Sequence, residues 1–253
     1  MKFDDLESKM RIYETAKDNS AVPGMYLIAR IDGRSFTRLT KEVHKFEAPF
    51  DIRFRDMMVE TVKHLMNCGF TVLYGYTQSD EISLLFDLHE SAFSRKPRKY
   101  NSILAGEASA KFSLLLGDIG IFDCRLIELP NARLVVDYFR WRNEDAHRNS
   151  LNGYCYWRLR QTGLTERQAT RKIEGISIAE KNELLFSLGV NFNEVPAWTK
   201  RGVGLYWTEV EKEGFNPKTQ ETVQTKRRQI HVDVDLPMRE AYSSFVGKLV
   251  GLD

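Results

Sequence analysis

Cysteine is scarce in this sequence: Cys68, Cys124 and Cys155 are the three present in 253 residues, and they lie far apart with no CxxC pair. This spacing excludes a secreted disulfide scaffold and a structural zinc site of the finger type. Long apolar runs are also missing, since no segment approaches the roughly 20 residues needed to span a bilayer. The N-terminal residues MKFDDLESKMR lack the apolar stretch of a signal peptide. We therefore expect a cytoplasmic protein without a membrane contact.

Internal repeats, low-complexity tracts and Gly/Ser linkers are absent too, which excludes a solenoid and leaves no sharp domain boundary. Hydrophobic residues make up 42% and charged residues 28%, values typical of a globular protein and too apolar for disorder. The net charge is +2, but basic residues gather in three clusters, each explained either by a solvated surface or by a polyanion-binding face. The residues that we assign to a candidate nucleic-acid surface are Lys96, Arg98, Arg158, Arg160, Lys226, Arg227 and Arg228.

Apolar periodicity predicts the elements of the first half of the chain. In order, they are a helix over about 4–18, a strand over 25–31, a helix over 49–67, strands over 70–77 and 81–86, a helix over 100–116 and a strand over 122–129. After the first helix the order is βαββαβ, the ferredoxin-like arrangement. We expect this palm-like unit to occupy residues 1–130.

The character of the sequence changes after Asn131. Helices are expected over about 133–161, 165–174 and 178–188, followed by strands over 203–210 and 221–234 and a helix over 238–250. Gly214, Asn216 and Pro217 indicate the turn between the two strands. The predicted class is therefore α+β, with a βαββαβ core and a C-terminal extension of helices and a β-hairpin over residues 131–253.

Two aspartates are expected at one edge of the predicted sheet. Asp32 follows the first strand and Asp80 lies in the turn between the next two, and the first and third strands of a βαββαβ sheet lie side by side. Carboxylate oxygens suit magnesium, and the Gly33 carbonyl can approach the same ion because glycine has no side chain. Two such ions would activate an attacking oxygen and neutralise a leaving phosphate. Plain turn chemistry at Asp32-Gly33 and at Asp80-Glu81 is the alternative, and the residues alone leave both open.

Four blocks of the sequence occur together in one known family. They are R-I-D-G-R-S-F at 30–36, Y-G-Y-T-Q-S-D-E at 74–81, D-A-H-R-N-S-L-N at 145–152 and A-E-K-N-E-L-L-F at 179–186. Their order and spacing resemble the tRNA-His guanylyltransferase family, over most of residues 1–200. The resemblance implies a polymerase-palm fold that holds two magnesium ions and adds nucleotides to the 5′ end of tRNA.

The resemblance also implies residue roles. It places Asp32, the Gly33 carbonyl and Asp80 on magnesium, and we count Glu81 with the catalytic carboxylates, although strand alternation points its side chain away from that of Asp80. The residues that it implies for the nucleotide or its triphosphate are Arg30, Gly33, Arg34, Ser35, Phe36, Ser79, Asp80, Lys99, His147, Asn149, Lys181 and Asn182.

The implied reaction has two stages. A 5′-monophosphate on tRNA is activated by ATP to a 5′-adenylylated end, and the 3′-hydroxyl of an incoming nucleotide, typically GTP, then displaces AMP. A tRNA that already bears a 5′-triphosphate can skip the first stage. The resemblance further implies a homotetramer, a dimer of dimers.

Two positions depart from the eukaryotic pattern of this family. Ala48 stands where those members carry lysine, so a phosphate-contacting cation is either missing or supplied by Lys45. Gly153 stands where they carry an asparagine that contacts the nucleotide. The departures resemble the bacterial and archaeal guanylyltransferase-like branch, which implies template-dependent addition and repair of 5′-truncated tRNAs.

Two other functions are kept as alternatives. A palm-domain nucleotide cyclase would share the paired carboxylates but would join free nucleotides. A non-catalytic ferredoxin-like RNA-binding module would use exposed strand aromatics, for which Tyr74, Tyr76 and Phe86 are the candidates.

Overall fold

The computed structural model describes residues 2–216 and 221–252 of the chain. Its strands form one antiparallel sheet in the order β4-β1-β3-β2-β5-β6. The first four strands in this order are those of the predicted βαββαβ core, so the expected α+β class is confirmed. The strands are β1 (Tyr26–Gly33), β2 (Val72–Gln78), β3 (Glu81–Phe86), β4 (Phe122–Leu129), β5 (Val203–Asn216) and β6 (Glu221–Asp233).

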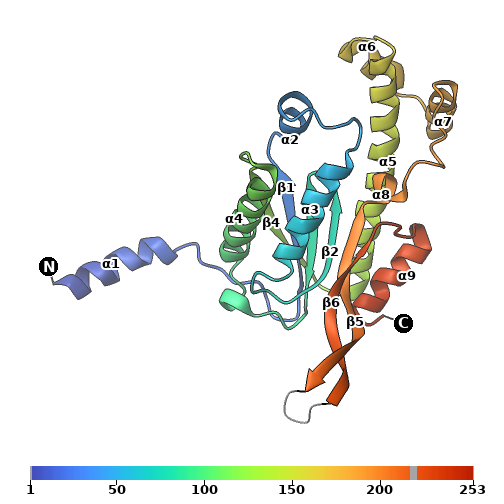
Figure 1. Ribbon diagram of the computed structural model, residues 1–253. Helices are drawn as coiled ribbons and strands as arrows, with labels where there is room; N and C mark the ends of the chain where they lie inside the picture. Colours follow the sequence, from blue (N-terminus) through green and yellow to red (C-terminus); the bar gives the residue numbers. More distant parts are fainter. Residues whose placement is uncertain (1, 217–220, 253) are drawn as a thin grey trace.

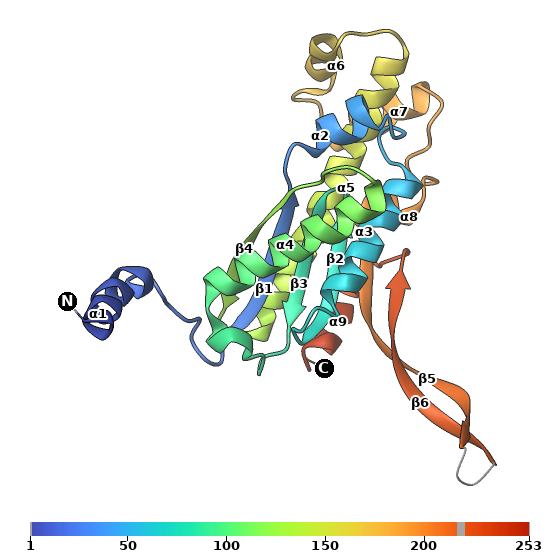
Figure 2. The ribbon, with the colours of Figure 1, turned by 60° about the vertical axis from the view of Figure 1, so that its left-hand side comes forward.

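Helices cover both faces of this sheet (Figures 1 and 2). On one face, α3 (Ile52–Leu65) and α4 (Pro97–Leu116) pack on a core that includes Leu27 and Ile31 of β1. On the other face, α5 (Ala132–Gln161) and α9 (Arg239–Leu249) pack on Ile28. Successive residues of β1 are therefore buried on opposite faces, which explains why this strand is a continuous apolar run.

The far end of α5 carries a small helical layer of its own. Two short helices there, α6 (Glu166–Ile173) and α7 (Ile178–Ser187), both begin with a capping box, in which the side chains of Thr165 and Ser177 accept the backbone N–H three residues later. α7 packs on α5 through a third apolar cluster that includes Leu151 and Leu185. The three predicted helices of this region are confirmed to within a few residues.

Two segments project from the body. The N-terminal helix α1 (Phe3–Thr15) has no buried residue, and the β5–β6 hairpin extends beyond the end of the sheet (Figures 1 and 2). Strand β5 runs further than the predicted 203–210 and includes Gly214 and Asn216, which were expected in the turn, while Pro217 lies outside the described residues. Strand β5 of the second half pairs with β2 of the first, so one sheet is shared by both halves of the chain. The domain boundary at residue 130 stays a prediction.

Several short elements were not predicted. They are α2 (Phe36–Arg38), the π-helical turn η1 (Leu39–Val43), the 3-10 turn η2 (Ala92–Arg95) and α8 (Ala197–Arg201). The helix expected from residue 49 begins later, because Asp51 caps it by accepting the backbone N–H of Arg53 at 2.8 Å. Strand β1 extends through Gly33, so Asp32 lies within the strand rather than after it. No helix among the described residues combines the length and apolar character needed to cross a membrane.

The packing of β2 on α3 depends on a glycine. A Cβ at Gly75 would lie 2.5 Å from Cγ1 of Val62, whereas a Cβ at Gly106 of α4 would meet nothing within 4 Å. We expect Gly75→Ala to lower the free energy of unfolding by about 1–3 kcal/mol through overpacking. The control Gly106→Ala should raise it by roughly 0.5–1 kcal/mol, as alanine does inside a helix. Urea unfolding of both variants measures this, and equal effects at the two sites would contradict it.

Candidate active site

The pairing of β1 with β3 assembles the acidic end of the site. Asp32 lies opposite Glu81 in the ladder, and the backbone N–H of Gly33 donates to the carbonyl of Asp80 at 3.0 Å. The expected adjacency of the first and third strands is therefore confirmed. A Cβ at Gly33 would lie 2.6 Å from Cδ2 of Phe36 and 2.9 Å from Cβ of Asp80, so this close approach requires glycine.

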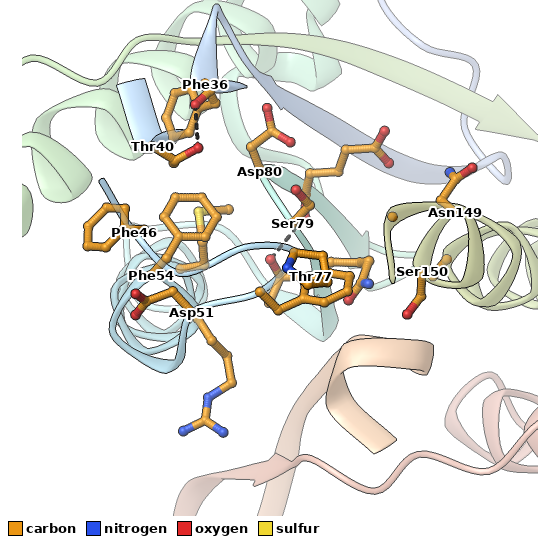
Figure 3. A pocket seen from close by; sticks show the side chains of 18 of the residues that line it. Phe36, Thr40, Phe46, Asp51, Phe54, Thr77, Ser79, Asp80, Asn149 and Ser150 are labelled. Carbon is orange, nitrogen blue, oxygen red and sulfur yellow. Dashed lines mark hydrogen bonds between the residues drawn. The ribbon is translucent and has the colours of Figure 1, made fainter. Parts of the chain in front are cut away.

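Asp80 is an acidic side chain without a cation. Among the described residues no Lys or Arg side chain pairs with it, and its local partner is the Ser79 side chain. Burial, followed by repulsion from Glu81 and Asp32, holds the pKa of this carboxyl above its ordinary value. Its side chain lies at the cavity shown in Figure 3, with Ser79 beside it.

Asp32 differs from Asp80 because arginines surround it. Arg30 donates to its two oxygens at 3.1–3.2 Å, and Arg125 donates to it at 2.9 Å. Burial raises the pKa of Asp32, but these hydrogen bonds outweigh burial and lower it. Asp32 is thus held in its ionised form by cations of this chain.

Glu81 is held in the same way. It accepts from Arg30 at 2.7 Å and from the buried Arg142 of α5. Its side chain therefore points toward α5, which agrees with the alternation expected from Asp80. Arg30, Asp32, Glu81 and Arg142 form one continuous charge network from β1 to α5.

A cavity of about 360 Å³ opens beside these carboxylates. It lies between the segment from α2 to α3 on one side and α5 on the other (Figure 3). This volume is within the range of small-ligand sites in proteins. Its lining includes Phe36, Thr40, Lys41, Phe46, Phe50, Asp51, Phe54, Ser79, Asp80, Glu81, Arg142, Asn149, Ser150, Gly153, Trp157 and Trp198.

Helix α5 provides one long wall of the cavity. Arg142, Ala146, Asn149, Gly153 and Trp157 line it at helical spacings of three or four residues. At 1.5 Å per residue, Arg142 and Trp157 are about 22 Å apart along the helix axis. The cavity is therefore elongated, with the acidic residues at one end.

One polar atom in this wall has no partner. The hydroxyl oxygen of Ser150 is buried and makes no hydrogen bond within the part of the chain that the structure describes. Buried hydroxyl groups are normally satisfied.

The expected nucleotide contacts divide into two groups. Phe36, Ser79, Asp80 and Asn149 line the cavity, and Arg30 and Gly33 lie directly behind its acidic end. The exposed Arg34 and Ser35 precede α2 but do not line the cavity. The structure does not bring Lys99, His147, Lys181 and Asn182 to it either.

The residues of the second group have other surroundings. Lys99 lies in the first turn of α4, over the ring of Phe93, beyond the end of β3 that is opposite the site (Figure 1). His147 packs against Phe192, and burial, followed by nearby cations, lowers its pKa. Lys181 and Asn182 lie on α7, which packs on the far end of α5.

The basic clusters do not form one continuous surface. Lys96 and Arg98 both pair with Asp18, and these contacts lower the pKa of that carboxyl. Arg158 and Arg160 lie in the last turn of α5, at the opposite end of the molecule.

The third basic cluster lies on the projecting hairpin, where Lys226, Arg227 and Arg228 are exposed. Lys226 approaches Glu209 at 3.6 Å, and the guanidinium of Arg228 stacks over Trp207 at 4.9 Å. None of the three clusters lines the cavity. A nucleic acid that contacted all of them would therefore have to extend far beyond it.

The burial of the strand aromatics contradicts the RNA-binding alternative. Tyr74, Tyr76 and Phe86 were its candidates, and all three are buried, with exposed fractions of 0–3%. Helices cover both faces of the sheet from which they project, so no base can stack on them.

The acidic end fits a divalent cation at Asp80. A half-buried carboxylate beside two others, with a raised pKa, lacks the positive charge that an oxygen-liganded ion provides. Among residues 2–216 and 221–252, however, no three Asp, Glu, His or Cys side chains are grouped as a metal site. Asp32 would coordinate such an ion only after Arg30 or Arg125 gave up its hydrogen bonds to this carboxylate.

Sequence reasoning missed Lys41, Arg142, Trp157 and Trp198. The signal for the two residues of α5 was present, because positions 142, 146, 149, 153 and 157 follow one helix face that also carries the expected Asn149. Lys41 had no such signal, because the π-helical turn that carries it was not predicted.

Comparison with known proteins gives two matches to family models. Residues 7–130 match the model described as tRNAHis guanylyltransferase, Thg1, and residues 133–239 match the model of the Thg1 C-terminal domain. A probable tRNA(His) guanylyltransferase of Bos taurus is 32% identical over 207 residues, which are 77% of this chain and 69% of that protein. The tRNA(His) guanylyltransferase of Debaryomyces hansenii is 30% identical over 233 residues, covering 86% of this chain and 88% of that protein.

Solved structures give the same result. A bacterial Thg1-like protein in complex with GTP is 28% identical, with a TM-score of 0.72, and covers 98% of this chain and 100% of its own. The ATP complex of a bacterial Thg1-like protein is 26% identical, with a TM-score of 0.74 and the same coverage. The Saccharomyces cerevisiae enzyme, at 23% identity and a TM-score of 0.71, shows the shared fold.

The uncompensated charge of Asp80 has a measurable consequence. Its folded-state pKa lies above the ordinary 3.8, so ionisation opposes folding once the pH exceeds that value. We expect Asp80→Asn to be more stable than the wild type at pH 7, and the difference to shrink as the pH falls toward 3.8. Urea unfolding at several pH values measures this. The control Asp137→Asn, at an exposed position of α5, should show no such trend, and a destabilised Asp80→Asn at pH 7 would contradict the assignment.

Proposed function

Because the chain belongs to the tRNA(His) guanylyltransferase family, we propose that it adds nucleotides to the 5′ end of tRNA in the 3′–5′ direction, with the cavity beside Asp80 as its nucleotide site. The observation that carries this proposal is the elongated cavity with one uncompensated carboxylate at its end. An anion as large as a triphosphate can bind there only with cations, and the site offers both arginines and a carboxylate for a metal.

Asp80 and, after rearrangement, Asp32 are the proposed magnesium ligands, together with the Gly33 carbonyl. When bound, magnesium neutralises the phosphate oxygens and makes an attacking oxygen more nucleophilic. Arg142 and Arg30 hold Glu81 on the α5 side of the cavity, so that its charge does not occupy the space of the phosphates. Asn149 lines the middle of the cavity, where its side-chain amide can donate to ribose or phosphate oxygens.

Both stages of the proposed reaction are displacements at phosphorus. In the first, an oxygen of the tRNA 5′-phosphate attacks the α-phosphorus of ATP, and the bond to pyrophosphate breaks. In the second, the 3′-hydroxyl of GTP loses its proton and attacks the 5′-phosphorus, and AMP leaves. One acidic site can serve both stages because each needs the same neutralisation of a pentacoordinate phosphate. The solved complexes of Thg1-like proteins with GTP and ATP support these two nucleotides as substrates.

We assign the chain to the template-dependent branch, which repairs 5′-truncated tRNAs. Gly153 supports this assignment, because a Cβ there would already touch Pro49 at 3.5 Å, so an asparagine would narrow the cavity at this point. The wider site suits nucleotides chosen by pairing with the opposite strand. The homotetramer and the cytoplasmic location stay predictions.

A 5′-extension assay tests the function directly. A tRNA that lacks its first nucleotide and an intact tRNA-His, both 5′-phosphorylated, are offered with ATP, GTP and magnesium. We expect the truncated tRNA to be extended faster. Asp80→Asn should lower turnover by a factor on the order of a thousand while tRNA binding is retained, and Asp137→Asn should leave both unchanged. Conversion of GTP without extension of tRNA would favour the cyclase instead.

The hairpin cluster is our candidate for a tRNA-backbone contact. Replacing Lys226, Arg227 and Arg228 by glutamine removes three exposed cations. If they contact phosphates, the slope of log affinity against log salt should become shallower by about two to three units. Filter binding of tRNA between low and moderate salt measures the slope. A glutamine variant at Lys63, Lys111 and Lys248, outside the clusters, serves as the control, and an equal slope in both variants would refute the contact.

A further inference from the structure

Lys41 lines the cavity, and the proposed function gives its positive charge no role. It lies in η1, and its ammonium donates to the carbonyl of Glu47 at 2.6 Å and to that of Pro49 at 3.3 Å. These carbonyls flank Ala48 on both sides. The ammonium therefore lies beside Ala48, held by the backbone of the segment that precedes α3. Lys45, the alternative source of a cation, is exposed and is not among the residues that line the cavity.

The ammonium of Lys41 has no carboxylate partner among the described residues. Asp51 is the nearby acid, but its oxygens are engaged by Arg53 at 2.6 Å and by the backbone N–H of Glu47 at 2.8 Å. Burial lowers the pKa of Lys41, and the ring of Trp157 lies 5.9 Å from its nitrogen. An ammonium has three donors, and two are used by the backbone. One N–H is left for a ligand in the cavity.

The position of Lys41 along the cavity indicates which part of a bound nucleotide its free N–H would meet. Trp157 lies about 22 Å along α5 from Arg142, which marks the acidic end. If phosphates lie at Asp80, the base of an extended nucleoside triphosphate lies toward Lys41. Aromatic side chains line this end, and Phe50 packs on Trp198 with ring centroids 6.0 Å apart. Flat apolar walls of this kind suit a purine.

We propose that Lys41 reads the base of the incoming nucleotide by donating a hydrogen bond to the carbonyl oxygen at C6 of guanine. Guanine presents two acceptors on this edge, O6 and N7, whereas adenine carries an amino donor at C6. A fixed ammonium therefore favours guanine over adenine. The backbone carbonyls of Glu47 and Pro49 hold the ammonium in place, and the ring of Trp157 lies beside it. This inference rests on the proposed function, because it requires the phosphates at the Asp80 end.

Equilibrium binding of three triphosphates tests the proposal without tRNA. GTP and inosine triphosphate both carry O6, and 2-aminopurine riboside triphosphate lacks it. With magnesium present, we expect the wild type to bind the first two about tenfold more tightly than the third, the size of a hydrogen bond to a charged group. In Lys41→Met this preference should disappear, because affinity for GTP and inosine triphosphate falls and affinity for the 2-aminopurine nucleotide is nearly unchanged.

Two further variants sharpen the result. Lys45→Met should keep the full preference, and Lys41→Arg, which retains a charged donor, should keep part of it. Equal weakening of all three nucleotides in Lys41→Met would identify a phosphate contact or a loop support and overturn the proposal. A wild type that binds all three equally would overturn it without any variant. A wild type that binds none of them would show instead that the proposed function itself is wrong.

Discussion

The register between β1 and β3 is the constraint on which the site depends. It puts Asp32 opposite Glu81 and joins Gly33 to Asp80 by a backbone hydrogen bond, so three carboxylates meet at one sheet edge. A shift of β1 by one residue relative to β3 would put Asp32 on the opposite face of the sheet from Glu81. The residues of β1 pack into two different cores, Leu27 and Ile31 on one face and Ile28 on the other, so such a shift would move each of them into the wrong core. The fold thereby holds together charges that would otherwise separate.

The three carboxylates are not equivalent, and their difference explains the chemistry that we propose. Arginines of the chain neutralise Asp32 and Glu81, while Asp80 lacks such a partner among the described residues and faces the cavity. Charge that the protein leaves uncompensated opposes folding but favours binding of a cation. The elongated cavity then sets the orientation of the proposed nucleotide, with its phosphates near Asp80 and its base near the aromatic end.

Much of this could be predicted from the sequence, and the reasons are local. Strand β1 is an apolar run that ends in Asp32-Gly33, and Asp80 lies in a short polar turn between two apolar strands, so both positions were found. The cavity wall opposite them could not be found in the same way. Lys41 reaches it from a π-helical turn, and Trp198 from a short helix, and neither element has a clear periodicity. Lys99 shows the converse, because a motif resemblance named it, but it lies in the first turn of α4, beyond the end of β3 that is opposite the site.

One measurement tests the central claim most directly: a crystal structure of this protein with magnesium and a non-hydrolysable GTP analogue. Our account predicts a magnesium ion bound to Asp80 and the triphosphate, with the guanine ring at the aromatic end and its O6 within hydrogen-bonding distance of the Lys41 ammonium. A nucleotide bound outside this cavity, or one with its phosphates at Lys41 and no metal at Asp80, would contradict it.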